Sequence, residues 1–318
     1  LKTVSWLQTD VCIITAIGET PAHIEFFHSR KNLIEEKAEL VKTLKKDGLL
    51  VLNADDESVL EMKVKSKNLT MTYGFKEGAN ILGSGDTIFY NDKDEPEGVI
   101  FRIDEEGKRL PVLIEGVFGR NHVYASLAAL ALSSGLIFNM IDAVGALKNY
   151  DVPPGRMRLL KGIENSFIID DTYNSSPFAC ESALKTFGDI KRVKFFEHNL
   201  ANESQDLSVS EGGREQGGRK IAVLGDMLEL GKHTVEAHKH IGKIAKENLS
   251  ENKDVLITVG PRAKTIKEGA LEAGMNPENI FEFSDSREVA NFIKTFIKKS
   301  DFVLVKGSQG MRMERAVE

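Results

Sequence analysis

Short, continuous apolar runs separated by amphipathic segments recur along the whole chain. Such runs are typical of strands that are buried on both faces of a parallel sheet, and amphipathic segments between them indicate helices. In the first half we expect strands at 11–15 and 49–53 and a helix near 33–46 between them. The order strand, helix, strand predicts an α/β fold built on a parallel sheet.

Between residues 69 and 115 the pattern changes to shorter alternating runs interrupted by glycines and turn residues. Runs at 87–90, 99–103 and 109–114 predict a small antiparallel β part inserted into the first domain. An alanine-rich segment at 121–135 then predicts a closely packed helix.

The rigid sequence Pro153-Pro154-Gly155 is the best domain boundary and divides the chain into 1–153 and 154–318. The α/β pattern repeats in the second part. Strands are expected at 167–170, 220–224, 255–259, 280–283 and 302–305, and helices at 177–187, 234–248, 263–273 and 286–299. The polar, glycine-rich stretch 195–219 is expected to be a flexible surface insertion.

Composition narrows the class of protein. The 318 residues are 41% hydrophobic and 28% charged, which suits two globular domains, and the net charge of -6 argues against nucleic acid as a main partner. Cys12 and Cys180 cannot build a disulfide framework, and no signal peptide or membrane-spanning run is visible, so we expect a cytoplasmic protein without membrane insertion. Because the sequence starts with Leu1 rather than Met, we expect a piece of a longer protein.

Two residues of the first domain are candidates for metal chemistry. His23 follows a buried strand, where a neutral imidazole can bind a divalent metal or satisfy loop backbone. Lys37 shares a predicted apolar stripe with Leu33, Leu40 and Leu44, and desolvation there would lower its pKa. A neutral amine can act as a nucleophile or take up carbon dioxide as a carbamate, whereas a snorkelling lysine would only cover the core.

Polar and glycine-containing turns follow several predicted strands of the second domain. They are Asp170-Asp171-Thr172-Tyr173-Asn174, Gly225-Asp226 with Glu229 and His238 beyond, and Lys306-Gly307-Ser308. Ligands of open α/β sheets bind beyond the carboxyl ends of the strands. The same residue types also make capped turns without any ligand, and both interpretations stay open here.

One motif of nucleotide-binding proteins is missing. A P-loop reads G-x-x-x-x-G-K-[ST], and no segment of this chain has that spacing. The nearest approach is Gly231-Lys232-His233, which has the wrong glycine spacing and no hydroxyl. We therefore expect the chain alone to show no ATP-dependent chemistry.

Taken in order, these segments resemble the Mur ligase family. The matching elements cover nearly the whole chain except the 195–219 stretch. They are Ala22-His23-Ile24-Glu25, Glu36-Lys37-Ala38-Glu39, Asn53-Ala54-Asp55, Gly119-Arg120, Leu127-Ala128-Ala129, Pro154-Gly155-Arg156, Asp170 to Asn174, Gly225 to Gly231 with His238, and Val305-Lys306-Gly307-Ser308.

The resemblance implies that 1–153 is the later part of a central domain binding ATP and Mg²⁺, and that 154–318 is a Rossmann-like C-terminal domain. It implies an ATP-dependent ligase of peptidoglycan synthesis, most similar to members that join D-Ala-D-Ala to a UDP-MurNAc-tripeptide through an acyl phosphate. UDP-MurNAc-peptide and D-Ala-D-Ala are then the small-molecule partners, and a monomer is expected. The missing front would hold the UDP-binding domain and the P-loop.

The resemblance also implies roles for single residues. His23 and carbamylated Lys37 would bind magnesium and support catalysis. Residues on the nucleotide side would be Asn121, His122, Arg156, Asp171, Tyr173 and Asn174. Residues on the side of the incoming substrate would be Asp226, Glu229, Lys306 and Ser308.

Two departures from the family pattern affect these roles. Asn121-His122 stands where the family usually has His-Asn, so the two residue types on the adenine side are in reversed order. Gln309 stands where arginine is frequent, so a neutral amide replaces a cation there. The alternatives are a ligase that adds the third residue, a folylpolyglutamate-type relative, and a non-catalytic scaffold or binding protein that kept the fold.

Overall fold

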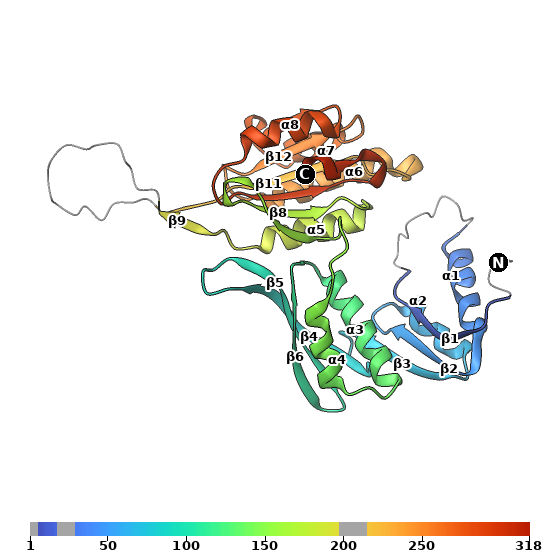
Figure 1. Ribbon diagram of the computed structural model, residues 1–318. Coiled ribbons are helices and arrows are strands. Elements are labelled where there is room, and N and C mark those ends of the chain that lie inside the picture. The colour runs from blue at the N-terminus through green and yellow to red at the C-terminus, as the bar shows by residue number, and fades with distance from the viewer. Residues whose placement is uncertain (1–5, 18–28, 197–214) are drawn as a thin grey trace, which may run out of the picture. The chain divides into compact units, whose positions relative to one another are not determined.

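The computed structural model describes residues 6–17, 29–196 and 215–318 (Figure 1). Contacts between Cα atoms divide the chain into two compact units. Unit 1 contains 1–90, 97–152 and 229–231, and unit 2 contains 91–96, 153–228 and 232–318.

A six-stranded sheet in the order β1-β2-β3-β4-β5-β6 forms the centre of unit 1. Its strands are β1 (Thr9–Ile14), β2 (Leu44–Asn53), β3 (Leu69–Gly74), β4 (Ile81–Tyr90), β5 (Pro96–Glu105) and β6 (Lys108–Glu115). The neighbours from β1 to β4 are parallel, and β5 and β6 are antiparallel. The predicted antiparallel part therefore begins later than residue 69, because β3 and β4 continue the parallel sheet.

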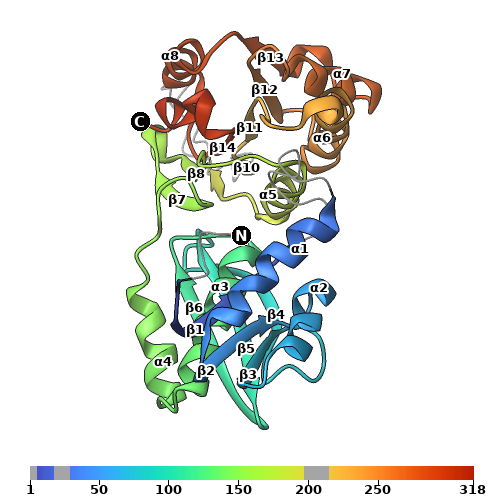
Figure 2. The same ribbon diagram turned by 90° about the vertical axis from the view of Figure 1, so that its right-hand side faces the viewer.

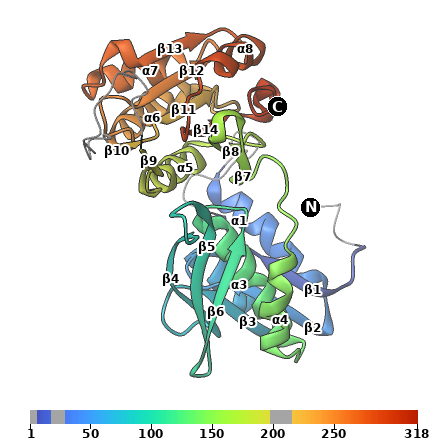
Figure 3. The same ribbon diagram turned by 60° about the vertical axis from the view of Figure 1, so that its left-hand side comes forward.

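Helices cover both faces of this sheet. They are α1 (Arg30–Glu39), α2 (Glu57–Leu60), α3 (Arg120–Gly135) and α4 (Met140–Ala146). Helix α3 packs on β2, β3 and β4, and α4 packs on α3 (Figure 3). The helix expected to reach residue 46 ends at Glu39, with a 3-10 turn over Leu40–Thr43. Leu44 instead pairs with Thr9 of β1, so sheet pairing overrides the local helix preference.

Strand β2 links two hydrophobic cores of unit 1. Leu49 and Val51 pack in the core beneath α3, whereas Leu50 and Leu52 pack in the core with α1. Successive side chains of a strand point to opposite faces, so one continuous apolar run supplies both cores.

The sheet of unit 2 has the order β13-β12-β11-β14-β8-β7. Its strands are β7 (Arg158–Lys161), β8 (Phe167–Asp171), β11 (Lys220–Gly225), β12 (Val255–Val259), β13 (Ile280–Phe283) and β14 (Phe302–Lys306). All neighbours are parallel except β7, which runs antiparallel to β8. The five strands expected here are confirmed to within one residue at each end, and β7 was not predicted.

Four helices flank this sheet: α5 (Pro177–Asp189), α6 (Thr234–Asn248), α7 (Lys264–Glu272) and α8 (Ser286–Phe296). Helices α5, α6 and α7 pack in a row, and α8 lies on the opposite face (Figure 2). The α/β fold class is confirmed. The ends of the expected 195–219 loop are short paired strands, β9 (Lys194–Phe196) and β10 (Glu215–Gly217), and 197–214 lie outside the described residues.

Candidate functional site

Two consecutive aspartates end strand β8, and both are buried. Asp170 accepts hydrogen bonds from the backbone nitrogen of Gly155 at 2.8 Å and from the hydroxyl of Thr172 at 2.7 Å. Asp171 accepts a hydrogen bond from the backbone nitrogen of Met157 at 3.3 Å. The two carboxylates thus anchor the chain on both sides of residue 156.

Arg156 is held between two residues of left-handed conformation, Gly155 with φ +72° and Met157 with φ +51°. A Cβ atom at Gly155 would lie 2.7 Å from the backbone nitrogen of Tyr173, so only glycine fits this close approach. The guanidinium carbon of Arg156 lies 4.0 Å from the centre of the Tyr173 ring. Since Arg156 is exposed and Tyr173 is 47% exposed, the pair offers a charged, stacked surface to solvent.

Lys306 lies opposite Asp171 in the register of β14 and β8. Its side chain is buried, and Nζ donates to Asp171 Oδ2 at 2.6 Å and to the backbone oxygen of Asn174 at 2.8 Å. A buried ammonium is costly unless it is paired, and here both contacts are internal. The Asn174 side chain is exposed beside this contact.

Asp226 follows β11 and is 1% exposed. Its Oδ1 accepts hydrogen bonds from the backbone nitrogens of Arg262 at 3.0 Å and Ala263 at 2.7 Å. These amides precede α7 and have no partner within that helix, so Asp226 caps the turn that begins it. One oxygen of the carboxylate predicted for substrate binding is therefore occupied by backbone donors, and Oδ2 lies 3.6 Å from the Arg262 guanidinium.

Ser308 joins the ends of β14 and β11. Its Oγ accepts a hydrogen bond from the backbone nitrogen of Leu228 at 2.9 Å, and its own nitrogen donates to the backbone oxygen of Asp226 at 3.1 Å. Glu229, one residue further, is exposed and has a left-handed φ of +62°. Ser308 therefore fixes the backbone from which Glu229 projects.

His238 on α6 supports the same backbone from inside. It is fully buried, its Nε2 accepts the Met227 amide at 2.9 Å, and Nδ1 lies 2.7 Å from the backbone oxygen of Thr234. These partners assign the proton of the neutral ring to Nδ1. Burial lowers the pKa of His238 below its ordinary value, against the opposing effects of the Thr234 carbonyl and Asp226.

The expectation that Lys37 lies on a buried stripe is wrong. Lys37 is exposed, and the buried residues of α1 are Leu33 and Ala38. The expected stripe ran on to Leu44, which belongs to β2 and not to a helix. His23 lies outside the described residues.

The two residues predicted for the adenine side begin α3 and differ in exposure. Asn121 is exposed and can contact a ligand. His122 is buried, and its Nδ1 lies 3.3 Å from the hydroxyl of Tyr150, with the two rings edge to face. His122 thus contributes to packing between α3 and the segment after α4.

A second stacked surface in unit 1 was not predicted as a site. The guanidinium carbon of Arg120 lies 4.1 Å from the centre of the Phe75 ring, and the same side chain pairs with Asp86 at 2.7 Å. Asp55 accepts hydrogen bonds from the Phe75 amide and the Tyr124 hydroxyl, both at 2.7 Å. In the sequence, Asp55 and Arg120 were noted only as parts of family motifs. Their spacing gave no indication that Arg120 would stack on Phe75 or that Asp55 would bind Phe75 and Tyr124.

The described residues contain no cluster of three or more His, Cys, Asp or Glu side chains able to bind a metal ion. In the same part of the chain, no helix has the length and apolar character needed to cross a bilayer.

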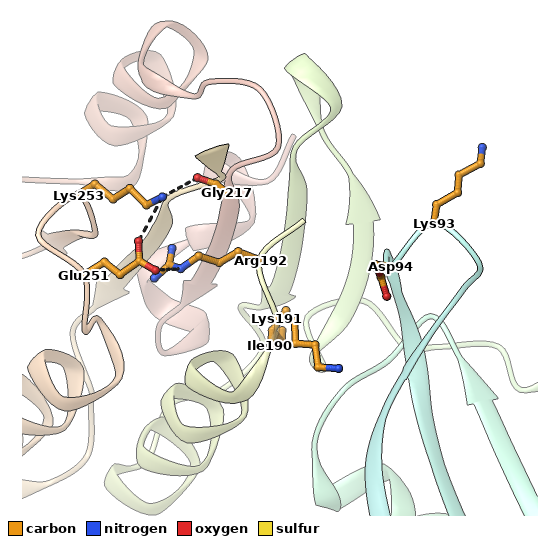
Figure 4. A pocket seen from close by; sticks show the side chains of 8 residues that line it. All are labelled: Lys93, Asp94, Ile190, Lys191, Arg192, Gly217, Glu251 and Lys253. Carbon is orange, nitrogen blue, oxygen red and sulfur yellow. Dashed lines mark hydrogen bonds and ion pairs between the residues drawn. The ribbon is translucent and has the colours of Figure 1, made fainter. Parts of the chain in front are cut away.

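A cavity of about 730 Å³ lies within unit 2. It is lined by Lys93, Asp94, Ile190, Lys191, Arg192, Gly217, Glu251 and Lys253 (Figure 4). Arg192 pairs with Glu251 at 2.8 Å and with buried Asp254 at 2.6 Å, and Lys253 donates to the Gly217 oxygen at 2.7 Å. Arg192 and Lys253 are thus already paired within the protein.

Comparison with known proteins identifies the family. The sequence model of the Mur ligase middle domain matches residues 2–133, and that of the Mur ligase glutamate ligase domain matches 207–309. UDP-N-acetylmuramoyl-tripeptide–D-alanyl-D-alanine ligase of Bacillus subtilis (strain 168) is 29% identical over 97% of this chain and 58% of its own length. The protein of the same name from Escherichia coli (strain K12) is 24% identical over 99% of this chain and 61% of its own. This chain thus spans about three fifths of these relatives.

Solved structures agree in fold. MurF ligase from Thermotoga maritima in complex with ADP has a TM-score of 0.70 and 24% identity, covering 98% of this chain and 61% of that one. A structure of MurF from Acinetobacter baumannii has a TM-score of 0.74 and 22% identity, covering 98% and 59%. The family predicted from the sequence motifs is confirmed, and the chain belongs to the Mur ligase family, with segments matching its middle and glutamate ligase domains.

Proposed function

We propose that this chain is the middle and C-terminal part of an ATP-dependent ligase that joins D-Ala-D-Ala to a UDP-MurNAc-tripeptide. The observation that carries the proposal is the match of 97–99% of the chain to ligases of that name from several bacteria. In the proposed reaction, ATP transfers its γ-phosphoryl group to the substrate carboxylate and leaves as ADP. The dipeptide amine then attacks the acyl carbon, an amide forms, and phosphate and a proton are released.

The proposed nucleotide contacts are the exposed members of the predicted set. Arg156 and Tyr173 offer a cationic, aromatic surface suited to a base or a phosphate, and Asn174 presents its amide nearby. Asn121 is also proposed to contact the nucleotide, as the family resemblance implies. Buried Asp171 and His122 support neighbouring backbone or packing, so their contribution to nucleotide binding is indirect.

On the side of the incoming substrate, the proposed direct contact is Glu229, whose exposed carboxylate suits the ammonium group of a dipeptide. Asp226, Lys306 and Ser308 keep their place in the site through internal hydrogen bonds that fix the strand-end turns.

The magnesium site that we propose combines Lys37 with His23, which lies outside the described residues. The exposed amine of Lys37 is accessible to carbon dioxide, and we propose that it carries a carbamate that holds magnesium together with His23. Magnesium, when bound, would offset phosphate charge. We further propose a monomeric protein that acts in the cytoplasm.

The test is a ligation assay on the chain joined to its upstream reading frame, with UDP-MurNAc-tripeptide and D-Ala-D-Ala as substrates. We expect ADP release and a pentapeptide product by mass spectrometry, and no ADP release from 1–318 alone. A single amino acid accepted in place of the dipeptide would favour a ligase of the third residue. Glutamate added to a folate would favour a folylpolyglutamate-type enzyme, and no turnover with any substrate would favour a scaffold.

Lys37→Ala tests the carbamate in the same assay. Activity should fall steeply and return in part with short-chain carboxylic acids, which replace the lost carbamate. Lys31→Ala is the matched control, since Lys31 is an exposed lysine of the same helix. Full activity of Lys37→Ala would contradict the proposal that Lys37 carries a catalytic carbamate.

A further inference from the structure

A chain of buried contacts runs from the end of β14 to the exposed surface of unit 2. Lys306 donates a hydrogen bond to Asp171, and Asp171 accepts a second one from the backbone nitrogen of Met157. Met157 directly follows Arg156 in the sequence. Arg156 is the exposed residue at the end of this series of contacts, and its guanidinium stacks on the Tyr173 ring.

We propose that Lys306 is a positioning residue: it holds Asp171 so that Arg156 is presented over Tyr173, and it does not contact substrate. The inference rests on the proposed function only in assigning the Arg156–Tyr173 pair to the nucleotide. It assigns Lys306 a different task from the substrate contact that the family resemblance implies.

The donors of Lys306 point inward. An ammonium group has three N–H donors, and two of them are directed at Asp171 and at the backbone oxygen of Asn174. With 1% exposure, the side chain is inaccessible to a ligand without rearrangement of β8 and its following turn. The same ammonium therefore fixes both the carboxylate and the turn that carries Tyr173.

Asp171 divides its two oxygens between these tasks. Oδ2 accepts from Lys306, and Oδ1 accepts from the Met157 amide. If Lys306 lost its charge, a buried carboxylate would stand without a counter-ion and would take up a proton or turn toward water. Either response weakens the acceptor that holds Met157.

Met157 needs that acceptor because its backbone is strained. A non-glycine residue at φ +51° is unfavourable and persists only where its surroundings hold it. Asp170 anchors Gly155 on the other side of Arg156. Loss of the Asp171 anchor alone should therefore release one side of Arg156 and spare the other.

The experiment compares the full chain with Lys306→Met, Asp171→Asn and the double variant. Amide hydrogen exchange measures the protection of the Gly155 and Met157 amides. NMR measures the chemical shift of the Arg156 Nε–H, which the Tyr173 ring displaces. The Tyr173→Leu variant identifies this ring-induced shift. Lys185→Met is the matched control, because it removes a lysine from an exposed pair with Glu181 in the same unit.

We expect Lys306→Met to speed exchange at Met157 by roughly tenfold, the effect of losing about one hydrogen bond, and to abolish the Arg156 shift. Gly155 should change less. The double variant should regain most of both signals, because the amide introduced by Asp171→Asn is neutral and its side-chain oxygen can still accept from Met157. Lys185→Met should resemble the wild type.

The proposal would be overturned by unchanged signals in Lys306→Met, by a double variant that stays unprotected, or by a double variant that does not fold. If Lys306→Met alone fails to fold, the double variant decides by the same criteria. ADP serves as a binding probe on the chain joined to its upstream reading frame, because residues 1–318 contain no P-loop, and its affinity should fall in Lys306→Met and recover in the double variant. Affinity that stays low in a double variant with restored signals would mean direct contact by Lys306. If ADP does not bind the wild type, the nucleotide assignment loses support, while exchange and NMR still decide the role of Lys306.

Discussion

His238 Nε2 lies 2.9 Å from the backbone nitrogen of Met227 and accepts a hydrogen bond from it. The other ring nitrogen donates to the Thr234 oxygen. A protonated imidazole would carry N–H groups on both nitrogens and would place one of them against the Met227 donor. The fold around the backbone before Glu229 therefore depends on a neutral histidine.

This dependence predicts loss of stability in mild acid. Because the pKa of His238 is lowered in the folded state, the unfolded chain binds the proton more readily. The stabilisation that neutral His238 gives the folded state is present above the ordinary histidine pKa of about 6.5. It is lost as pH falls below about 6.5 toward the lower pKa of the folded state. Urea unfolding between pH 7.5 and 5.5 should show a steeper loss for wild type than for His238→Gln, which can form both hydrogen bonds without titrating. Parallel curves for the two proteins would contradict this role.

Gly155→Ala should destabilise unit 2 by about 1–3 kcal/mol. Its φ is +72°, and the added Cβ would lie 2.7 Å from the Tyr173 nitrogen. Gly145→Ala is the control, since no atom lies within 4 Å of its Cβ position near the end of α4, and should stabilise by about 0.5–1 kcal/mol. Denaturant unfolding checks both, and equal effects would show that the close approach at Gly155 is relaxed in solution.

Asp226→Ala should cost about 1–3 kcal/mol, because it leaves the buried amide of Ala263 and the partly buried amide of Arg262 without an acceptor. Glu229→Ala removes an exposed carboxylate and should stay within about 0.5 kcal/mol of wild type. If the proposed function is right, Glu229→Ala should instead raise KM for the dipeptide in the ligation assay. We therefore expect Asp226→Ala to lower the stability and Glu229→Ala to raise KM. A loss of stability in Glu229→Ala as large as that in Asp226→Ala would contradict this prediction.

Ile137→Gly should stabilise unit 1 by about 1 kcal/mol. Ile137 is 92% exposed and has φ +61° after the end of α3, a position where glycine avoids the strain of a β-branched side chain. Ile141→Gly, at an exposed site inside α4, should destabilise by about 0.5–1 kcal/mol. Thermal unfolding should therefore shift in opposite directions, and a loss of stability in both variants would indicate that Ile137 makes a contact that offsets its strain.

Most strands and helices of unit 2 followed directly from the sequence, whereas β7, β9 and β10 did not. The run 255–259 and the amphipathic segment 234–248 match β12 and α6 residue for residue, because a buried strand and an amphipathic helix each leave a periodic pattern. The same reasoning failed at Leu44, where pairing with Thr9 ended a helix that the local pattern favoured. The apolar stripe predicted from Leu33 to Leu44 is therefore not present on one helix, and Lys37 is exposed.

The sequence by itself determined the α/β class, most elements of unit 2 and the positions of polar turns after its strands, because burial and backbone preference act on neighbouring residues. It did not separate residues that can meet a ligand from residues that hold the turns in place. Asp171 and Tyr173 lie two positions apart, yet one is buried against Lys306, 135 positions away, and the other is exposed. Only the tertiary structure decided this, since the partner of a buried polar group is set by strand register between segments that are distant in the chain.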